Sequence, residues 1–264
     1  MAKIRRHLMP RPCSLLILLL SALPLLARAE AIGGYAAGCQ TGAQALPQAG
    51  PGFYVVRAER QRYYGQPELI DYLHTLAQRA QQAGLPPLLV ADMAKEHGGP
   101  FAYGHRSHQT GLDADIWLRP GDTGLPAEEQ DMVDHRLYIL NRHFGDDQRQ
   151  LIALAAQDPR VSRIFVHPLI KQAMCRAYGD APWLNRLRPW FGHSGHFHVR
   201  LHCPAASQHC EPQQAVPPGT GCGRELASWI DDRSGELAAG PRQPWRPVLP
   251  AACRVLLADK ETDE

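Results

Sequence analysis

Two segments of the chain concentrate its histidines. Eight of the 13 histidines lie within residues 97–108 and 193–209. In the second segment His196 and His198 are two positions apart, so their imidazoles would project from the same face of a β-strand. Such a cluster either binds a metal ion or consists of polar surface groups, and an H-x-H pair alone does not decide between the two. The residues around the first segment narrow the choice.

The first segment supplies a further histidine together with two carboxylates. His108 ends a glycine-rich stretch, and Asp113 and Asp115 follow in a run where polar and apolar residues alternate. This alternation predicts a strand with both carboxylates on its polar face. A histidine, a carboxylate and a second histidine held by two strands would form a zinc site with a fourth position for water, as in catalytic zinc sites. Spacing leaves either Asp113 or Asp115 as the carboxylate ligand.

The surrounding sequence predicts the elements that bring these side chains together. Residues 97–111 are rich in glycine and predict a loop. The predicted strands, which are alternating or continuously apolar, are 88–90, 112–118, 161–166 and 196–203. The predicted helices, three of which begin with proline, are 67–83, 147–156, 168–177 and 182–189. This mixture favours an α+β fold, with a mainly antiparallel sheet that carries the zinc site and helices packed around it.

The N-terminus has the three parts of a secretory signal peptide. Basic residues between Lys3 and Arg11 precede an apolar run over 15–26, and the small residues Ala27 and Ala29 follow at the spacing of a cleavage site. The apolar run is shorter than the ~20 residues that a membrane-spanning helix needs. We therefore expect removal of residues 1–29 on export, and no membrane span in the mature chain.

Removal of this segment changes the charge balance. The whole chain has 28 Lys and Arg residues against 26 Asp and Glu residues, and the five basic residues of segment 1–29 face no acidic ones there. The mature chain therefore carries a small excess of acidic residues. Because no basic surplus remains, the composition does not favour a nucleic-acid partner.

The mature chain has the length of one domain and an even number of cysteines. About 235 residues follow position 29, enough for a full hydrophobic core. We expect one domain over 30–238 and a proline-rich C-terminal tail over 239–264. Six cysteines in an exported chain predict three disulfides, and the absence of any C-x-x-C pair weakens the alternative of a structural zinc site. Cys203 and Cys210 are close enough in sequence to form a local bridge.

Four linked motifs resemble those of the penicillin-insensitive murein endopeptidases. They are GHRSHQTGLDADI over 104–116, VSRIFV over 161–166, RPWF over 188–191 and HSGHFHVR over 193–200. The likeness extends from about Gly33 to Cys253 and so covers nearly the whole mature chain. This family is related to the lysostaphin-type and D-Ala-D-Ala metallopeptidases. Together the motifs are far more specific than an H-x-H pair.

The resemblance assigns roles to the clustered residues. It implies that His108, Asp115 and His198 are the zinc ligands, which selects Asp115 over its neighbour two positions earlier. It also implies that His193 and His196 are catalytic and do not bind zinc. They would act on the attacking water or on the developing oxyanion.

A second metal ion is associated in the family with the position of His105. The partner element in the family is a D-x-x-H, and the corresponding local sequence of this chain, DMVDHR over 131–136, departs from it. Asp134 is the candidate replacement. Among the aromatic residues near these motifs, Trp117 and Trp190 are expected in the core rather than at a substrate surface.

The resemblance also implies the disulfides, the substrate and the compartment. The implied pairs are Cys39–Cys253, Cys175–Cys222 and Cys203–Cys210, so that Cys253 ties the C-terminal tail back to the domain. The implied activity is zinc-dependent hydrolysis of D-alanyl–meso-diaminopimelate cross-links of peptidoglycan in the periplasm. No serine lies in a G-x-S-x-G elbow, which argues against a serine hydrolase. The alternative function is a catalytically silent, zinc-containing module that binds peptidoglycan.

Overall fold

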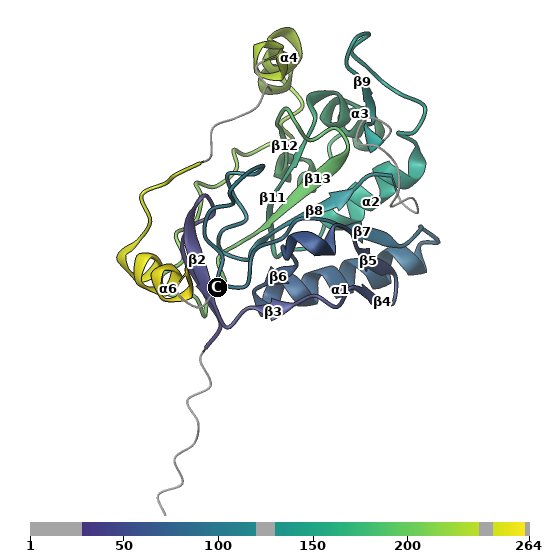
Figure 1. Ribbon diagram of the computed structural model, residues 1–264. Helices are drawn as coiled ribbons and strands as arrows, with labels where there is room; N and C mark the ends of the chain where they lie inside the picture. Colours follow the sequence, from purple (N-terminus) through teal and green to yellow (C-terminus); the bar gives the residue numbers. More distant parts are fainter. Residues whose placement is uncertain (1–27, 120–129, 238–244, 262–264) are drawn as a thin grey trace, which may run out of the picture.

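The computed structural model describes residues 28–119, 130–237 and 245–261. Nearly all of the predicted signal peptide, residues 1–27, lies outside the described residues, and so does part of the predicted proline-rich tail. Figure 1 shows one sheet at the centre of the molecule, with helices around it. The expected α+β class is confirmed.

Seven strands form the central sheet. Their order across the sheet is β12 (Leu187–Pro189), β11 (Val161–Val166), β13 (His196–Leu201), β8 (Asp113–Trp117), β7 (Leu88–Val90), β5 (Phe53–Val55) and β4 (Ala49–Gly50). Neighbouring strands are antiparallel, except for β11 with β12 and β5 with β7. The sheet is therefore mainly antiparallel, as expected, and its middle strands β13 and β8 come from the two histidine-rich regions.

Three short two-stranded ladders lie outside the central sheet. They are β1 (Glu30–Gly34) with β2 (Ala37–Thr41), β3 (Gln44–Ala45) with β6 (Tyr64–Gly65), and β9 (Val133–Asp134) with β10 (Ile139–Leu140). The β1–β2 hairpin carries Cys39, which is fully buried. This hairpin therefore gives the C-terminal region a fixed point of attachment.

Three longer helices pack against the sheet. α1 (Pro67–Gln82) begins with proline in its first turn and turns one apolar stripe toward the core, formed by Leu69, Leu73, Leu76, Ala77 and Ala80. α2 (Asp146–Ala156) contacts α1 and β11, and α3 (Pro168–Tyr178) contacts β12. The 3₁₀ helices whose residues are all described are η1 (Ala58–Arg60) and η3 (Pro182–Arg186).

Residues 182–189 differ from the single helix that the sequence predicts. Helical structure ends at Arg186, and the next three residues form β12, which pairs in parallel with β11. Leu187 lies opposite Ile164 in this ladder and is fully buried. Pairing with a strong neighbouring strand and burial of Leu187 therefore outweigh the local helical preference.

The C-terminal region contains helices that the sequence pattern does not predict. They are α4 (Arg224–Asp231), α5 (Ser234–Leu237) and α6 (Ala251–Glu261). Figure 1 places α6 beside β2, and the disulfide Cys39–Cys253 joins the two. The other disulfides, Cys175–Cys222 and Cys203–Cys210, are also the pairs that the family resemblance implies.

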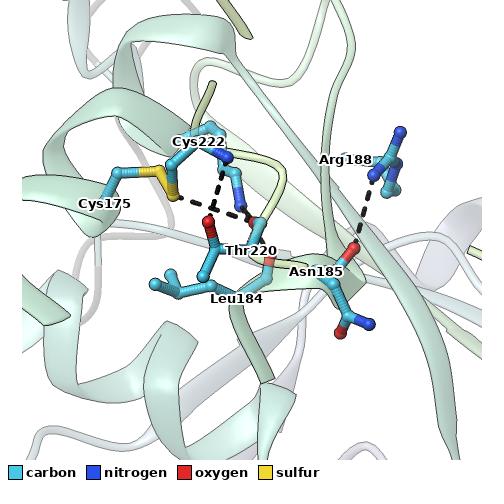
Figure 2. Close-up of a disulfide and its surroundings, with 7 residues drawn as sticks. Cys175, Leu184, Asn185, Arg188, Thr220 and Cys222 are labelled. Atoms are coloured by element: carbon cyan, nitrogen blue, oxygen red, sulfur yellow. Dashed lines mark hydrogen bonds between the residues drawn. A yellow bond between two sulfur atoms is a disulfide. The ribbon is translucent and has the colours of Figure 1, made fainter. Parts of the chain in front are cut away.

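The bridge Cys175–Cys222 fastens the segment before α4 to α3 (Figure 2). Fully buried Lys171 in α3 reinforces this connection, because its Nζ donates to the backbone oxygens of Leu184 at 2.5 Å and Thr220 at 2.7 Å. Among the described residues, no helix combines the length and the apolar character needed to cross a membrane.

Candidate metal centre

The register between β8 and β13 brings the two histidine-rich regions together. His198 lies directly opposite Asp115, and Arg200 lies opposite Asp113. Directly opposed side chains in an antiparallel pair share one face and have Cβ atoms about 5 Å apart. The polar faces of the two strands therefore form one continuous polar surface within the sheet.

Asp115 is at the centre of this surface. Its Oδ1 lies 3.3 Å from His198 Nδ1 and 3.4 Å from His108 Nε2, and its Oδ2 lies 3.2 Å from His105 Nε2. One ligand atom from each of these four residues lies within 4.8 Å of the others. The structure thus brings the three expected zinc ligands together, with His105 as a fourth member of the group.

The donor atoms of this group fit a metal ion. His108 is fully buried, and Asp115 and His198 are at most 3% exposed. Both ring nitrogens of His108, Asp115 Oδ1 and His198 Nε2 have no hydrogen-bond partner. Buried polar atoms almost always have partners, and a cation shared by His108 Nε2 and Asp115 Oδ1 would supply one to each. Two imidazoles and one carboxylate are a donor set typical of catalytic zinc.

The loop before β8 presents His108 in an uncommon backbone conformation. Its φ is 67°, in the left-handed region that non-glycine residues seldom occupy. The backbone N–H of His108 donates to Asp113 Oδ2 at 3.0 Å, and Gly111 provides another positive φ of 68° three residues later. Backbone strain of this kind persists where surrounding contacts hold it, often at functional sites.

Asp113 supports the group without joining it. Its two oxygens accept hydrogen bonds from Arg200 Nε at 2.8 Å and Nη2 at 2.9 Å. Its Oδ1 also lies 3.4 Å from His198 Nε2, so that Nδ1 of the same ring faces Asp115. Although burial opposes ionisation, Arg200 and His198 hold the pKa of Asp113 well below its ordinary value. A carboxylate behind a ligating histidine fixes the ring and its tautomer.

The electrostatics of the group favour neutral rings at His105 and His198 and an ionised Asp115. Burial lowers the pKa of His198, and burial lowers the pKa of His105 to about 4. Although burial opposes its charge, the neighbouring His105 and His196 hold the pKa of Asp115 well below its ordinary value. Burial also opposes protonation of His108, but Asp115 raises its pKa on balance. A metal ion competes with that proton, because it binds only the unprotonated nitrogen.

His193 and His196 lie at the more accessible side of the group. His196 Nε2 is 3.6 Å from Asp115 Oδ2, and its side chain is 20% exposed. The ring of His193 is 5.0 Å from that of His196 and 5.8 Å from that of His198. Each catalytic candidate therefore lies within 6 Å of an expected ligand, His193 of His198 and His196 of Asp115.

Asp134 lies in a different setting from the one expected for a second metal ligand. Its Oδ1 accepts the backbone N–H groups of Arg136 and Leu137 and so stabilises a turn. Within the described part of the chain, the metal-capable group that contains His105 does not include Asp134.

Asp92 is the acidic partner of His105 that the sequence analysis missed. Its Oδ2 lies 3.6 Å from His105 Nε2 and also contacts Arg62 at 2.9 Å and Arg60 at 3.3 Å. It follows the buried strand β7, which is the neighbour of β8. An acidic residue at the end of a predicted buried strand was the signal available in the sequence.

The two tryptophans near the motifs differ in exposure. Trp117 is buried, as expected, but Trp190 is 49% exposed. The Trp190 ring packs edge-on against Phe165 and also contacts Trp229 from α4. The expectation of a core position is therefore wrong for Trp190, because α4 covers it only in part.

A second group of metal-capable side chains consists of His135, His167 and Glu236. Glu236 Oε1 is 2.5 Å from His135 Nδ1 and 3.5 Å from His167 Nε2, and His135 Nε2 is 2.8 Å from Asp131 Oδ2. His167 Nδ1 accepts the Leu169 N–H at 3.2 Å, so the proton of the neutral ring is on Nε2, facing Glu236. His135, Glu236 and Asp131 therefore form a hydrogen-bonded network, whereas His167 Nε2 faces Glu236 without a hydrogen bond.

Comparison with known proteins agrees with the family resemblance that the motifs indicate. Residues 31–258 match the family model described as penicillin-insensitive murein endopeptidase. Proteins with that name from Haemophilus influenzae and Klebsiella pneumoniae are 48% and 41% identical to this chain over 239 and 243 residues. These alignments cover 87% and 89% of this chain and 83% and 88% of the relatives. The chain belongs to the penicillin-insensitive murein endopeptidase family.

Proposed function

We propose that this protein is a zinc-dependent endopeptidase that hydrolyses D-alanyl–meso-diaminopimelate cross-links of peptidoglycan. Family membership supports a peptidase that acts on murein. The observation that carries the zinc dependence is the pair of buried, unpartnered atoms His108 Nε2 and Asp115 Oδ1, with His198 Nδ1 3.3 Å from the same carboxylate oxygen. Such atoms are costly to bury without a partner, and these residue types are those that zinc prefers.

His108, Asp115 and His198 would hold the zinc ion, through Nε2, a carboxylate oxygen and Nδ1. When bound, zinc supplies Lewis acidity toward the scissile carbonyl and lowers the pKa of water at the site. Asp113 would keep the His198 ring oriented. Because the three ligand side chains are buried, bulk water does not reach them from the protein interior. The fold therefore holds the three proposed ligand side chains in place before the metal ion binds.

His196 and His193 would carry the proton chemistry. His196 Nε2 has no hydrogen-bond partner, so it is available to take a proton from the attacking water and to pass one to the leaving amine. His193 Nδ1 is 3.3 Å from the Trp190 carbonyl oxygen, which can only accept, so the neutral ring keeps its lone pair on Nε2. Burial holds the pKa of His193 well below its ordinary value, so the ring is neutral before the reaction. A proton released by the attacking water to Nε2 would make His193 a donor toward the oxygen that gains negative charge, and this proton would then pass to the leaving amine.

The compartment follows from the predicted signal peptide and the three disulfides. Disulfides persist in oxidising compartments, so we propose that the protein acts in the periplasm, where peptidoglycan is accessible. The alternative function, a silent module that binds peptidoglycan, gives no reason for His193 and His196 beside the ligands.

The test is digestion of purified cross-linked muropeptides, with products identified by mass. We expect cleavage at the D-alanyl–diaminopimelate bond, loss of cleavage after removal of zinc by a chelator, recovery when zinc is returned, and no inhibition by a β-lactam. Stoichiometric zinc without cleavage would identify the silent module. Inhibition by the β-lactam would indicate a serine nucleophile and contradict the proposal.

A further inference from the structure

A cavity of about 590 Å³ lies between three segments that are far apart in the sequence. Its walls come from η1 and the residues after it, from segment 95–100, and from segment 249–258. Its volume is within the range of small-ligand sites. We propose that this cavity binds the aminocarboxylate end of the diaminopimelate in the stem peptide that donates the D-alanine. The proposal rests on the proposed function and names a substrate subsite for it.

The charged groups around the cavity match a ligand that carries both signs of charge. Arg60, Lys95 and Arg254 bring cations from three different segments, and Glu96 brings one carboxylate. In the donor stem, diaminopimelate precedes the D-alanine and keeps a free carboxylate and a free ammonium at the far end of its side chain. Cations suit the carboxylate, especially guanidinium groups, and Glu96 suits the ammonium. A lysine at the same position of a stem peptide lacks the carboxylate.

Arg60 connects the cavity to the metal centre. Its Nη1 is 3.3 Å from Asp92 Oδ2, this oxygen is 3.6 Å from His105 Nε2, and this nitrogen is 3.2 Å from Asp115 Oδ2. Because consecutive distances share an atom, the Arg60 nitrogen lies no more than about 10 Å from the Asp115 oxygen.

This distance fits the proposed ligand. An extended chain advances ~3.3 Å per residue, and diaminopimelate is the residue next to the D-alanine. Its side chain adds several further bonds in the direction away from the backbone. The aminocarboxylate end can therefore reach the cavity while the scissile bond lies at the metal centre.

The C-terminal helix forms one wall of the cavity and is fastened in place. The disulfide Cys39–Cys253 joins α6 to β2, and Arg254 follows Cys253 directly. Leu257 packs so closely on Gly99 that an added Cβ would come within 2.7 Å of it. One guanidinium nitrogen of Arg254 donates to the Leu249 oxygen at 2.6 Å, which holds the side chain near the cavity. This arrangement gives the tail a role in substrate binding.

The experiment uses binding, because binding does not depend on cleavage. The probes are two un-cross-linked disaccharide tetrapeptides, one with diaminopimelate and one with lysine, titrated calorimetrically into the zinc-loaded protein. We expect tighter binding of the diaminopimelate probe, and about a 10-fold loss of that affinity in Arg254→Gln, as for one charge-assisted hydrogen bond. Lys95→Gln, on the opposite wall, should reduce the same affinity.

Arg176→Gln is the matched control. Arg176 is also an exposed helical arginine that follows a disulfide cysteine, but it lies on α3, well away from α6 in Figure 1. It should bind both probes as the parent does. Equal affinity of the parent for the two probes, or equal behaviour of Arg254→Gln and Arg176→Gln, would overturn the proposal. Cleavage of cross-linked muropeptides by the parent, measured in parallel, would show that only the subsite had failed.

Discussion

Two groups of histidine and carboxylate side chains in this protein have similar composition but different hydrogen bonding. In the metal centre, His108 Nε2 and Asp115 Oδ1 are buried and have no hydrogen-bond partner, and His198 Nδ1 faces the same carboxylate oxygen at 3.3 Å. In the second group, Glu236 contacts both His135 and Arg233, the latter at 3.1 Å. The donor atoms of the first group therefore suit a cation, whereas Glu236 in the second group already has cationic partners.

The two groups also differ in the protonation of their histidines. In the second group the Nδ1 lone pair of His167 accepts the N–H of Leu169, and burial lowers the pKa of His167 to about 4. Its neutral ring therefore carries its only proton on Nε2, which would have to leave before a metal ion could bind there. The two groups have similar residue types. They differ in whether the ring nitrogens that face the carboxylate have a lone pair available for a metal ion.

The largest expected difference is between two variants that each remove the central carboxylate of one group. Asp115→Ala should lose both zinc and cleavage, because Asp115 is the proposed ligand that the other donors surround. The matched variant Glu236→Gln should keep both. Metal analysis and muropeptide digestion on the same preparations check this prediction. Zinc loss in Glu236→Gln together with zinc retention in Asp115→Ala would reverse the roles of the two groups.

The next effect separates proton transfer from metal binding. His196→Ala should retain zinc and lose ~10²–10⁴-fold in kcat, the usual contribution of a positioned acid or base. Kinetics and zinc content of the variant provide the measurement. A zinc-free variant would make His196 a ligand, and an unchanged kcat would leave the proton transfer to His193.

A smaller effect is expected at the residue behind the ligands. Asp113→Asn should still bind zinc at saturation but with ~10–100-fold weaker affinity, because Asp113 faces Nε2 of His198 and would orient that ring without being a ligand itself. Competition with a zinc-binding dye measures the affinity. If the Asp113→Asn variant bound no zinc even at a saturating zinc concentration, Asp113 would be a ligand itself.

The smallest effect concerns the stability that the second group contributes. Glu236, despite burial, has a pKa lowered by His135, and His135, despite burial, has a pKa raised by Glu236. Their stabilisation is therefore complete between the ordinary values of 4.5 and 6.5, and it is lost as pH falls through the Glu236 pKa or rises through the His135 pKa.

Because His135 is largely exposed, Glu236→Gln should cost only about 1 kcal/mol of unfolding free energy within that window. Outside the window the variant and the parent should converge. Urea unfolding across pH checks this expectation. A difference that stays constant with pH would show that ionic pairing does not contribute.

The sequence pattern predicts much of the site but leaves one choice open. Alternation correctly places the carboxylates on one strand face and the H-x-H pair on another. Asp113 and Asp115 remain equivalent at that level, and only the register, with Asp115 opposite His198 and Asp113 opposite Arg200, distinguishes them in the structure. Register depends on pairing between distant segments, which periodicity within one segment does not contain.

The elements that local pattern fails to predict are those that depend on tertiary contacts. Strand β12 exists because β11 offers it a partner, and α6 is held by a disulfide to a distant hairpin. Asp92 approaches His105 only because β7 lies beside β8. In each case the deciding interaction joins residues that are far apart in the chain.

The most direct test of the comparison is to locate the metal by anomalous scattering at the zinc edge from crystals of the zinc-loaded protein. We predict a strong peak among His108 Nε2, Asp115 and His198 Nδ1, and no peak beside Glu236. A peak between His135 and Glu236, or none near Asp115, would contradict the central claim that the unpartnered group is the metal centre.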